Sequence, residues 1–422
     1  MKISLCIICK DEEKKIARCI NSVKEKVDEI VVVDTGSTDN TINIVKELGA
    51  KVFEIPWEND FAKARNYAIS KCKGNWIVFL DADEYLLGSC LNNLRPYIIQ
   101  AENNKHDFIL VEILNEQKDR IQNTFKTIRI FKNHPAIKYK GSIHELLYKE
   151  GGQLKGIDYS EHLRVLHDGY IKEVVDEKQK IDRNITMLLK EYEKNPTSSD
   201  ICYYLMESYS GKNDLEKTWE FANKILTYNN STLSGVVQST YDRLLDVCQK
   251  THKTIEEILD IYNKAIEADS QYPDFDFRLG CYLYKSEAYE KAIPYLNTCI
   301  AKMEVYKGAV SSRAMGNPIG VFQVLSQCYI NVGRIKDAIP YLVKILHMNP
   351  YEYTVLYTLI QILGTVETGE AIGEFLKKLY NFNNLKDQMV LVQITKKVGN
   401  TDLYNYIVSR VSDEVKQKLA VI

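Results

Sequence analysis

No stretch of this sequence is apolar for long enough to cross a membrane, and neither sign of charge is in clear excess. The 422 residues include 55 basic and 57 acidic side chains, which gives a formal net charge of -2. Nucleic acid binds strongly basic proteins, so we do not expect it as the main partner. The apolar N-terminal stretch is interrupted at Lys10 and Asp11, too early for a signal peptide or a membrane span. We expect a cytoplasmic protein.

Two common nucleotide-binding motifs are also missing. The sequence contains neither GxGxxG nor GxxxxGK[ST], so we expect neither a dinucleotide-dependent enzyme nor a P-loop kinase. One C-x-x-C is present, at Cys6 and Cys9, without a second pair or a histidine partner. Residues three apart in a strand point to opposite faces, so no zinc or redox site is expected. The ten cysteines are predicted to be reduced and buried.

The feature that carries chemistry is a pair of acids at the end of an apolar strand. Residues 76–80 are short, continuously apolar and flanked by polar residues, which predicts a strand buried on both faces. Asp81 and Asp83 follow it, at the edge where open α/β sheets bind ligands. Two carboxylates repel each other unless a cation lies between them. An isolated Asp-x-Asp is more often a solvated loop, so its neighbours decide whether it is a metal-diphosphate clamp.

Strands and helices alternate before this motif, which indicates βαβ units and a parallel sheet. Strands are predicted at 3–8, 29–33 and 51–55, with a helix opening at Asp11 and another after the polar turn 34–40. The turns at 9–12 and 34–40 should meet the two acids at one edge. Later stretches, 108–114 and 126–131, alternate more strongly, as antiparallel or edge strands do.

Basic and imidazole side chains accompany the acids. Asp60 is a predicted N-cap, and Arg65 on the following helix leads towards the acid pair, as a partner for a phosphate or a carboxylate. Three of the seven histidines lie between residues 144 and 167, and His144 stands beside Glu145. Imidazole suits proton transfer or metal binding at neutral pH, and hydrogen-bonded surface histidines are the alternative.

The second half of the chain has a different pattern. A chain of this length is expected to form two domains, and from about residue 175 the predicted strands give way to paired amphipathic helices. The phrase Ala-Ile-Pro-Tyr-Leu occurs twice, 46 residues apart, and Asn-Pro recurs. This pattern resembles tetratricopeptide repeats, with an insertion around 301–318. We predict a sheet domain at 1–175 and an all-α repeat domain at 176–422 that serves as an interaction surface.

The motifs of the first half, in this order and spacing, resemble the family 2 glycosyltransferases, which have the GT-A fold. The matching segments are 31–39, 59–66, 79–84 and 141–145. The resemblance implies an α/β fold with a GT-A-type, mostly parallel sheet. It further implies a UDP-sugar donor and Mg²⁺ or Mn²⁺ as cofactor.

The same resemblance implies a nucleotide site. Asp34 would hold the uracil or ribose, Arg65 would support the donor, and Asp81 and Ala82 would lie near the nucleotide. The implied site also includes Cys9, Asp11 and Glu12, where the family's usual Thr-Tyr-Asn-Glu is replaced by Cys-Lys-Asp-Glu. Only a backbone contact is expected from Cys9.

The resemblance also implies a metal site and a base. Asp83 would bind the metal and His167 would complete its shell, while Glu145 or His144 would take the acceptor proton. On an extended segment, adjacent residues point to opposite sides, so only one of these last two is expected to face the donor. His167 is the next choice for the base.

The combination of catalytic domain and helical repeats resembles the peptide S-glycosyltransferases of glycosylated bacteriocins, of the sublancin and thurandacin type. The shared stretches are Asp81 to Asp83, Gly141 to Glu145 and His167 to Tyr170. This implies a metal-dependent inverting transferase that moves a hexose to a cysteine, or to a serine or threonine, of a peptide or protein bound by the repeats. A homodimer is one candidate assembly.

Other functions stay open at this point. A cell-surface glycan or a lipid could be the acceptor in place of a peptide. A haloacid-dehalogenase-like phosphatase also places Asp-x-Asp after a strand, but on its first strand and followed by Thr or Val, whereas Glu84 and Tyr85 follow here. A non-catalytic repeat scaffold is the third alternative, because repeat proteins often only bind.

Overall fold

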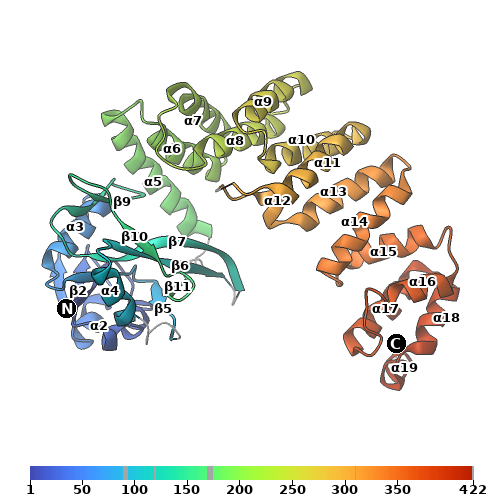
Figure 1. Ribbon diagram of the computed structural model, residues 1–422, viewed down its shortest axis with the longest axis horizontal. Helices are drawn as coiled ribbons and strands as arrows, with labels where there is room; N and C mark the ends of the chain where they lie inside the picture. The colour runs from blue at the N-terminus through green and yellow to red at the C-terminus, as the bar shows by residue number, and fades with distance from the viewer. Residues whose placement is uncertain (89–93, 118–119, 169–173, 309, 421–422) are drawn as a thin grey trace. The chain divides into compact units, whose positions relative to one another are not determined.

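The computed structural model describes residues 1–88, 94–117, 120–168, 174–308 and 310–420 (Figure 1). The chain divides into two compact units, residues 1–197 and 198–422. A mixed sheet with helices forms the first unit, and helices alone form the second, which confirms the predicted fold class. The assignment of separate functions to 1–175 and 176–422 stays a prediction.

The first unit is built on one large, mostly parallel sheet. Its strand order is β3-β2-β1-β4-β7-β6-β11-β5, with β10 beside β6. The first four strands of that order are parallel, and β7 runs antiparallel to both β4 and β6. The strands are β1 (Ile3–Cys9), β2 (Glu29–Asp34), β3 (Lys51–Glu54), β4 (Trp76–Phe79), β5 (Glu84–Leu86), β6 (Phe108–Gln117), β7 (Arg120–Lys132), β10 (Gly156–Asp158) and β11 (Arg164–His167). The predicted parallel strands and the later antiparallel ones are thus confirmed.

Two layers cover this sheet. Helices α1 (Ile16–Asn21), α2 (Thr41–Glu47) and α4 (Leu94–Asn103) pack with one face of β1 and β4 in a single apolar cluster. Helix α3 (Phe61–Lys71) and the hairpin of β8 (Ile137–Lys140) and β9 (Leu146–Lys149) pack on the other face. Cys9 lies in the first cluster and Cys6 in the second, which confirms that they point to opposite faces. The sheet is therefore buried on both sides, as its apolar strands require.

One helix begins later than the sequence pattern predicts. The charged stretch from Asp11 was expected to open a helix, but α1 begins at Ile16, after a turn, and is followed by the short helix η1 (Lys24–Lys26). Asp11 has a left-handed backbone, with φ of 54°, and its carboxylate accepts a hydrogen bond from the Thr38 amide at 2.7 Å. A residue held in that conformation cannot belong to an α-helix. The predicted N-cap is confirmed, since Asp60 accepts a hydrogen bond from the Lys63 amide at 2.8 Å.

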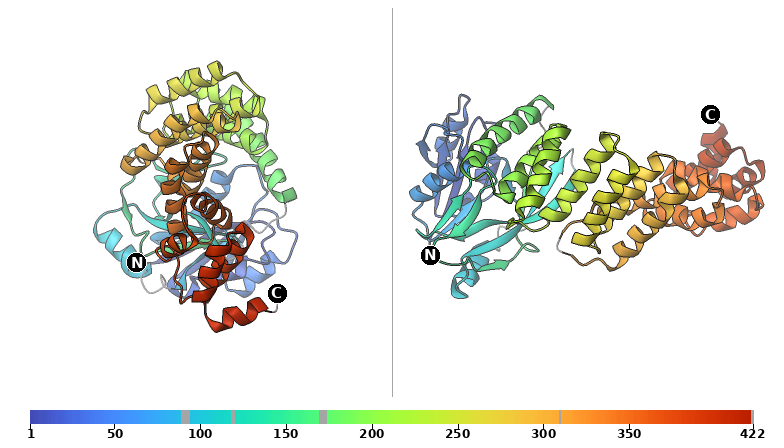
Figure 2. Two further views of the ribbon diagram at one scale, coloured as in Figure 1. Left: turned by 90° about the vertical axis from the view of Figure 1, so that its right-hand side faces the viewer. Right: turned by 90° about the horizontal axis from the view of Figure 1, so that it is seen from above.

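Helix α5 (Val174–Lys194) closes the first unit, and paired helices fill the second (Figure 2). These helices are α6 (Ser199–Gly211), α7 (Leu215–Tyr228), α8 (Val236–Lys250), α9 (Ile255–Ala268), α10 (Pro273–Lys285), α11 (Tyr289–Val305), α12 (Arg313–Gly316), α13 (Pro318–Asn331), α14 (Ile335–Met348), α15 (Tyr353–Leu363), α16 (Gly369–Leu376), α17 (Leu385–Val398), α18 (Thr401–Arg410) and α19 (Asp413–Ala420). A Cβ on Gly280 would lie 2.7 Å from Leu296, so this glycine allows α10 and α11 to cross closely. The helical repeats predicted from the sequence are present.

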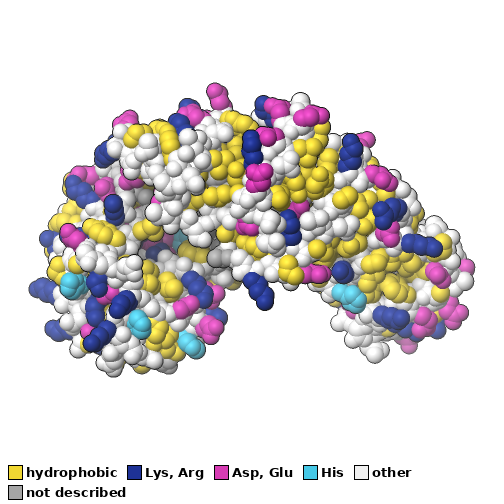
Figure 3. Space-filling model, turned by 45° about the horizontal axis from the view of Figure 1, so that its top comes forward, with side chains coloured by type: hydrophobic (Ala, Val, Ile, Leu, Met, Phe, Trp, Pro, Cys, Tyr) yellow, Lys and Arg dark blue, Asp and Glu magenta, His cyan; other side chains and the backbone are white. Residues whose placement is uncertain are grey.

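The surface agrees with the balanced composition. On the face drawn in Figure 3, basic and acidic side chains are interspersed, without a large area of one sign. Among the described residues, the structure contains no helix with the length and apolar character of a membrane span.

Candidate active site

The polar turns that follow β1, β2 and β4 meet at one edge of the sheet, as predicted. Cys9 and Asp34 are aligned at the ends of the parallel pair β1 and β2, and β4 lies on the other side of β1. This edge is formed by the carboxyl ends of the strands, where parallel sheets bind ligands.

The Asp34 carboxylate shapes the turn behind β2. It is 1% exposed, and its Oδ1 accepts hydrogen bonds from the amides of Gly36 and Ser37, both at 2.8 Å. Its Oδ2 accepts from the Ser37 hydroxyl and from Cys9 Sγ, the latter at 3.6 Å. Both oxygens are therefore committed to the loop, and burial with the nearby Asp34 charge raises the pKa of the Cys9 thiol far above its ordinary value.

The turn after β1 is tied to the turn after β2. Besides the Asp11–Thr38 contact, the Glu12 amide donates to Thr41 Oγ1 at 2.8 Å, and the Asp11 amide donates to Ser37 Oγ at 2.9 Å. The predicted nucleotide-binding segments at Cys9 to Glu12 and at Asp34 are thus cross-linked into one rigid edge. These three contacts each join a backbone amide of one turn to a side-chain oxygen of the other, and the Cys9 side chain adds its contact with Asp34.

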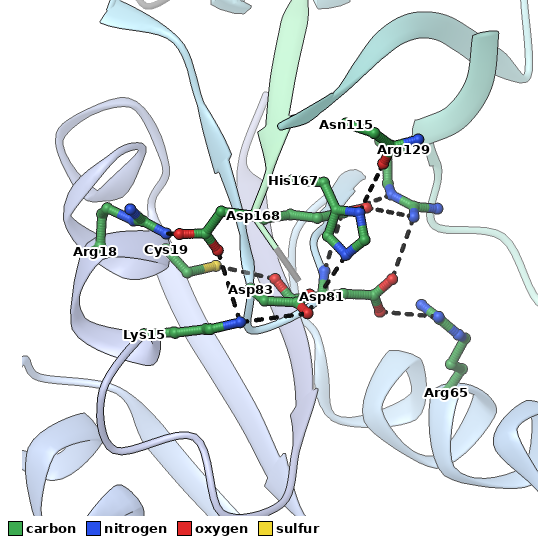
Figure 4. A network of polar contacts seen from close by, with 11 residues as sticks. Lys15, Arg18, Cys19, Arg65, Asp81, Asp83, Asn115, Arg129, His167 and Asp168 are labelled. Carbon is green, nitrogen blue, oxygen red and sulfur yellow. Dashed lines mark hydrogen bonds and ion pairs between the residues drawn. The ribbon is translucent and has the colours of Figure 1, made fainter. Parts of the chain in front are cut away.

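Asp83 and His167 face each other at the same edge (Figure 4). His167 Nε2 lies 3.4 Å from Asp83 Oδ2, and His167 Nδ1 lies 2.8 Å from Asn115 Oδ1. The hydrogen bond to Asp83 raises the pKa of His167 above its ordinary value, against the effect of burial. Burial would raise the pKa of Asp83, but His167 and Lys15 hold it below its ordinary value. The sequence predicted both residues and missed Asn115.

Lys15 and Asp168 extend the pair. Lys15 Nζ lies 3.9 Å from Asp83 Oδ2 and 3.7 Å from Asp168 Oδ1. Asp168 Oδ2 accepts a hydrogen bond from Arg18, whose guanidinium lies 4.1 Å from the centre of the Tyr85 ring. A cationic side chain therefore already lies beside the Asp-x-Asp carboxylates. Asp168 directly follows His167 in the sequence, and this position was the only signal in the sequence that it belongs to the site.

Asp81 is held between two arginines rather than facing the same way as Asp83. Arg65 Nη2 donates to Asp81 Oδ1 at 2.9 Å, and Arg129 Nη2 donates to Asp81 Oδ2 at 3.2 Å. Burial would raise the pKa of Asp81, but these two guanidinium groups hold it below its ordinary value. Ala82 between the acids is buried. The sequence predicted Arg65 and missed Arg129, which lies within an alternating strand pattern.

Glu145 belongs to this network. Glu145 Oε1 accepts from Arg65 Nε at 2.5 Å, so Arg65 joins Glu145 to Asp81. Arg65 is 7% exposed, and within the part of the chain that the structure describes its Nη1 has no hydrogen-bond partner. His144 is exposed and has a left-handed backbone with φ of 53°, so the segment is not extended as the sequence argument assumed. Gly169 and Tyr170 of the predicted motif lie outside the described residues.

The donor atoms fit a divalent cation only in part. Among the described residues, no group of three or more His, Cys, Asp or Glu side chains is arranged to hold a metal ion. One carboxylate and one imidazole face each other, however, and Asn115 Oδ1 accepts from Nδ1, which directs Nε2 at Asp83. Without a cation between them, two acceptors at this distance repel unless His167 is protonated. Mg²⁺ or Mn²⁺ usually takes its remaining ligands from substrate phosphates and water, so this donor set is compatible with such a cation.

Comparisons with known proteins agree with this architecture. Residues 4–156 match the family model Glycosyl transferase family 2. A TPR repeat-containing protein of Synechococcus elongatus is 40% identical over 147 residues, 35% of this chain and 35% of that protein. The SPbeta prophage-derived glycosyltransferase SunS of Bacillus subtilis is 30% identical over 187 residues, 44% of each. The chain thus spans less than half the length of these two relatives.

A solved structure aligns with a larger share of the chain. The crystal structure of S. aureus TarS 1-349 in complex with UDP-GlcNAc is 17% identical, with a TM-score of 0.37, and covers 64% of this chain and 92% of that one. The family match rests on the sequence, and it covers the segments that carry Asp34, Arg65, Asp81, Asp83 and Glu145, whereas His167 lies beyond its end. The chain therefore carries a glycosyltransferase family 2 domain at residues 4–156, followed by helical repeats.

Proposed function

We propose that the chain is a metal-dependent, inverting glycosyltransferase that moves a hexose from a UDP-sugar to a side chain of a peptide or protein. The observation that carries the proposal is the Asp83–His167 pair, which Asn115 orients at the carboxyl edge of a family 2 domain. A carboxylate and an imidazole nitrogen that face each other can share a cation whose remaining ligands come from substrate phosphates and water.

In this proposal, Asp83 and His167 would hold Mg²⁺ or Mn²⁺ at the sugar-diphosphate linkage. The cation would offset the charge that develops on the leaving diphosphate. Lys15, near Asp83, would contact the same anion, and the rigid turn around Asp34 would hold the nucleoside. Because Arg65 is buried between Glu145 and Asp81, we propose that it supports the donor through Asp81 rather than by direct contact.

Glu145 is the proposed base, and its position next to the arginine network favours it over the exposed His144. A base at this place would take the proton of the acceptor as the sugar is transferred. The carboxylate is fixed by Arg65, so its orientation is set before the acceptor binds. If substitution of Glu145 leaves sugar transfer unchanged, His167 is the next candidate for the base.

The acceptor class is proposed from the combination of domains. The resemblance to the peptide S-glycosyltransferases favours a cysteine, with serine or threonine as the alternative, and the repeats would bind the rest of the acceptor. A cell-surface glycan or a lipid acceptor, and a non-catalytic scaffold, are the rival functions. A cytoplasmic location and a homodimer are likewise proposals.

The experiment is a transfer assay read by intact mass. The full chain is incubated with a panel of UDP-sugars and Mg²⁺ or Mn²⁺, and with three peptides that differ only by Cys, Ser or Ala at one position. We expect a mass increase of one hexose on the Cys or Ser peptide, none on the Ala peptide, and none with a chelator. UDP-sugar hydrolysis or transfer without metal would contradict metal dependence, and no turnover of any UDP-sugar would favour the scaffold.

A further inference from the structure

One edge of the β8–β9 hairpin is closed by a side chain of α3. Asn66 donates from Nδ2 to the Tyr139 carbonyl and accepts from the Tyr139 amide with Oδ1, both at 2.8 Å. An amide side chain thus takes the place of a neighbouring strand along β8. Tyr139 stands opposite Leu147 in the register of the hairpin. Because both main-chain groups of Tyr139 bond to Asn66, this pair exchanges no hydrogen bonds of its own.

The other edge of the hairpin, along β9, is open. In an antiparallel pair that exchanges no hydrogen bonds, both residues direct their amide and carbonyl outward, so those of Leu147 point away from β8. Within the described part of the chain, neither group of Leu147 has a hydrogen-bond partner, and the outward amide of Lys149 has none either. Unpaired main-chain groups are rarely buried, so we expect this edge to face solvent.

Apolar side chains lie on both faces of the hairpin at this edge. Leu146 and Tyr148 are 57% and 37% exposed and belong to the outer face. Leu147 faces the sheet, at the margin of the apolar cluster that also includes Ile128 of β7. On that side of β6, the even-numbered residues 108–116 are only half-buried, whereas the odd-numbered residues 109–115 of the other side are buried. A strand paired with β9 would therefore cover apolar surface that is now exposed.

The open edge begins next to the proposed base. Glu145 precedes Leu147 by two residues, which is about 7 Å of extended chain. Alternate residues of a strand share a face, and directly opposed residues of paired strands do so as well. A chain paired with β9 would thus direct every second side chain to the face that Glu145 and Leu147 use. On this face Glu145 accepts its hydrogen bond from Arg65, so a residue opposite Glu145 would face the candidate active site.

We propose that the acceptor polypeptide binds in extended form as an added strand along β9, with the modified residue opposite Glu145 and the residue two positions away paired with Leu147. An extended main chain offers donors and acceptors at the two-residue spacing of the open groups of Leu147 and Lys149. Main-chain recognition admits many sequences and leaves selectivity to alternate side chains. The inference rests on the proposed function, because that function makes the bound polypeptide the acceptor. The rival occupant is a second copy of this chain that pairs through its own β9.

The test is binding of a synthetic strand to the full chain, read by fluorescence anisotropy. The probe is the fluorescein-labelled, amidated peptide Lys-Thr-Val-Thr-Ser-Thr-Val-Thr-Lys, in which serine is the acceptor residue. One copy is N-methylated at both valines, and a matched copy is N-methylated at the two threonines beside the serine. Amides of alternate residues point to opposite edges of a strand. We therefore expect the valine copy to bind at least about fivefold more weakly than the unmethylated peptide, and the threonine copy to bind equally well.

A pair of variants tests the same hydrogen bond from the side of the protein. Leu147→Pro removes the outward amide and keeps the pairing of β8 with β9, because an edge strand accepts proline where its amide has no partner. Leu147→Ala is the matched control, since it loses the side chain and keeps the amide. We expect Leu147→Pro to bind the unmethylated peptide about fivefold more weakly than Leu147→Ala does. UDP affinity and melting temperature, measured on both variants, should be alike.

The proposal would be overturned by equal effects of the two methylation patterns, by equal affinity of the two variants, or by no binding at millimolar peptide. A dimer of the unmodified chain that Leu147→Pro dissociates, seen by analytical ultracentrifugation, would assign the edge to a second copy instead. Peptide binding as expected, without turnover of any UDP-sugar, would contradict the proposed function and leave the edge as a polypeptide site. Hexose transfer to the peptide at the same rate in Leu147→Pro and Leu147→Ala would overturn this inference alone.

Discussion

Arg129 donates two hydrogen bonds to Glu84, from Nε to Oε2 at 2.8 Å and from Nη2 to Oε1 at 2.6 Å. The same Nη2 also donates to Asp81. Glu84 is 3% exposed and its Oε2 also accepts a hydrogen bond from the Asp81 amide at 3.2 Å, and Arg129 supplies the positive charge that balances this buried carboxylate. The pair links β7 to the loop that carries the two acids, since Glu84 also begins β5. Arg129 and Glu84 thus hold the loop that carries Asp81 and Asp83.

We expect Arg129→Met to destabilise the fold by about 3 to 5 kcal/mol, because it leaves a buried carboxylate unpaired. The double variant Glu84→Gln with Arg129→Met should regain most of the melting temperature, since both buried charges are gone. It should still bind UDP in the presence of Mn²⁺ about tenfold more weakly, because Asp81 has lost one of its two arginines. Calorimetric unfolding and UDP titration of both variants check this. Full recovery of UDP affinity in the double variant would mean that Arg129 serves stability alone.

Asn115 should act on the metal through His167. We expect Asn115→Ala to weaken Mn²⁺ affinity by about 10- to 100-fold, as loss of a partner that orients a metal ligand usually does. The fold should be kept, and His167→Ala should weaken the metal further. Electron paramagnetic resonance of bound Mn²⁺ in the presence of UDP measures the effect. An Asn115→Ala variant with unchanged Mn²⁺ affinity would remove Asn115 from the site.

Metal affinity should rise with pH. The pKa of His167 is raised by its hydrogen bond to Asp83, so the proton competes with the cation up to a higher pH than it would on an ordinary imidazole. Below that raised pKa, His167 is protonated and the metal binds weakly; above it, binding reaches a plateau. The slope should disappear in His167→Ala. A titration of Mn²⁺ affinity from pH 6 to 9 in both proteins tests this, and the same slope in both would exclude His167 as the titrating ligand.

The base should be Glu145. We expect Glu145→Gln to lower kcat by about 10²- to 10⁴-fold, the usual contribution of a positioned general base. His144→Ala should change turnover little, because that side chain is exposed and has a left-handed backbone. UDP affinity is measured together with kcat. Loss of the base alone should leave UDP affinity unchanged, whereas a disturbance of Arg65 should lower it. Transfer by both variants across pH 6 to 9 would shift the assignment to His167.

The boundary between the units should decide whether a truncated domain folds. Helix α5 contributes to the first unit: Glu191 accepts a hydrogen bond from the Ser142 amide at 2.5 Å, and the Arg183 guanidinium lies 5.4 Å from the centre of the Phe61 ring. We expect residues 1–197 to stay soluble and bind UDP, and residues 1–175 to lose stability because these contacts are gone. Melting temperatures and UDP titration compare the two. Loss of peptide transfer with retained UDP binding is expected in the longer fragment, and full peptide transfer would mean that the repeats serve another partner.

Much of the candidate site at the carboxyl edge of the sheet could be predicted from the local sequence pattern. Asp81 and Asp83 end an apolar strand, Asp34 ends another, and parallel pairing brings such ends together without knowledge of distant contacts. Asn115 could not be predicted this way. Its place opposite His167 depends on the register between β6 and β11, which are separated by about fifty residues of chain and pair only in the folded sheet.

The contacts of Arg129 and of the insertion could not be predicted either, because both depend on segments that are distant in the chain. An arginine in an alternating strand is usually solvated, and only the pairing of β4 with β7 places this one against Glu84 and Asp81. The insertion was visible as a break in the repeats. Asp274, which accepts a hydrogen bond from the Arg313 amide of the insertion, lies earlier in the chain, in α10. The start of α1 was also predicted too early, because the backbone of Asp11 is left-handed and its side chain contacts a neighbouring turn. The helix therefore begins only at Ile16.

The central claim is that Asp83 holds a divalent cation on which donor binding depends. Calorimetric titration of UDP into the full chain, with Mn²⁺ and with a chelator, tests it in the unmodified chain and in Asp83→Asn. Asp413→Asn is the control, since its side chain is 93% exposed. We predict that UDP binds with Mn²⁺ and at least about tenfold more weakly with the chelator, and that Asp83→Asn, while folded, shows the weak affinity in both conditions. Equal UDP affinity with and without Mn²⁺, or an Asp83→Asn variant that responds to Mn²⁺ as the unmodified chain does, would contradict the account.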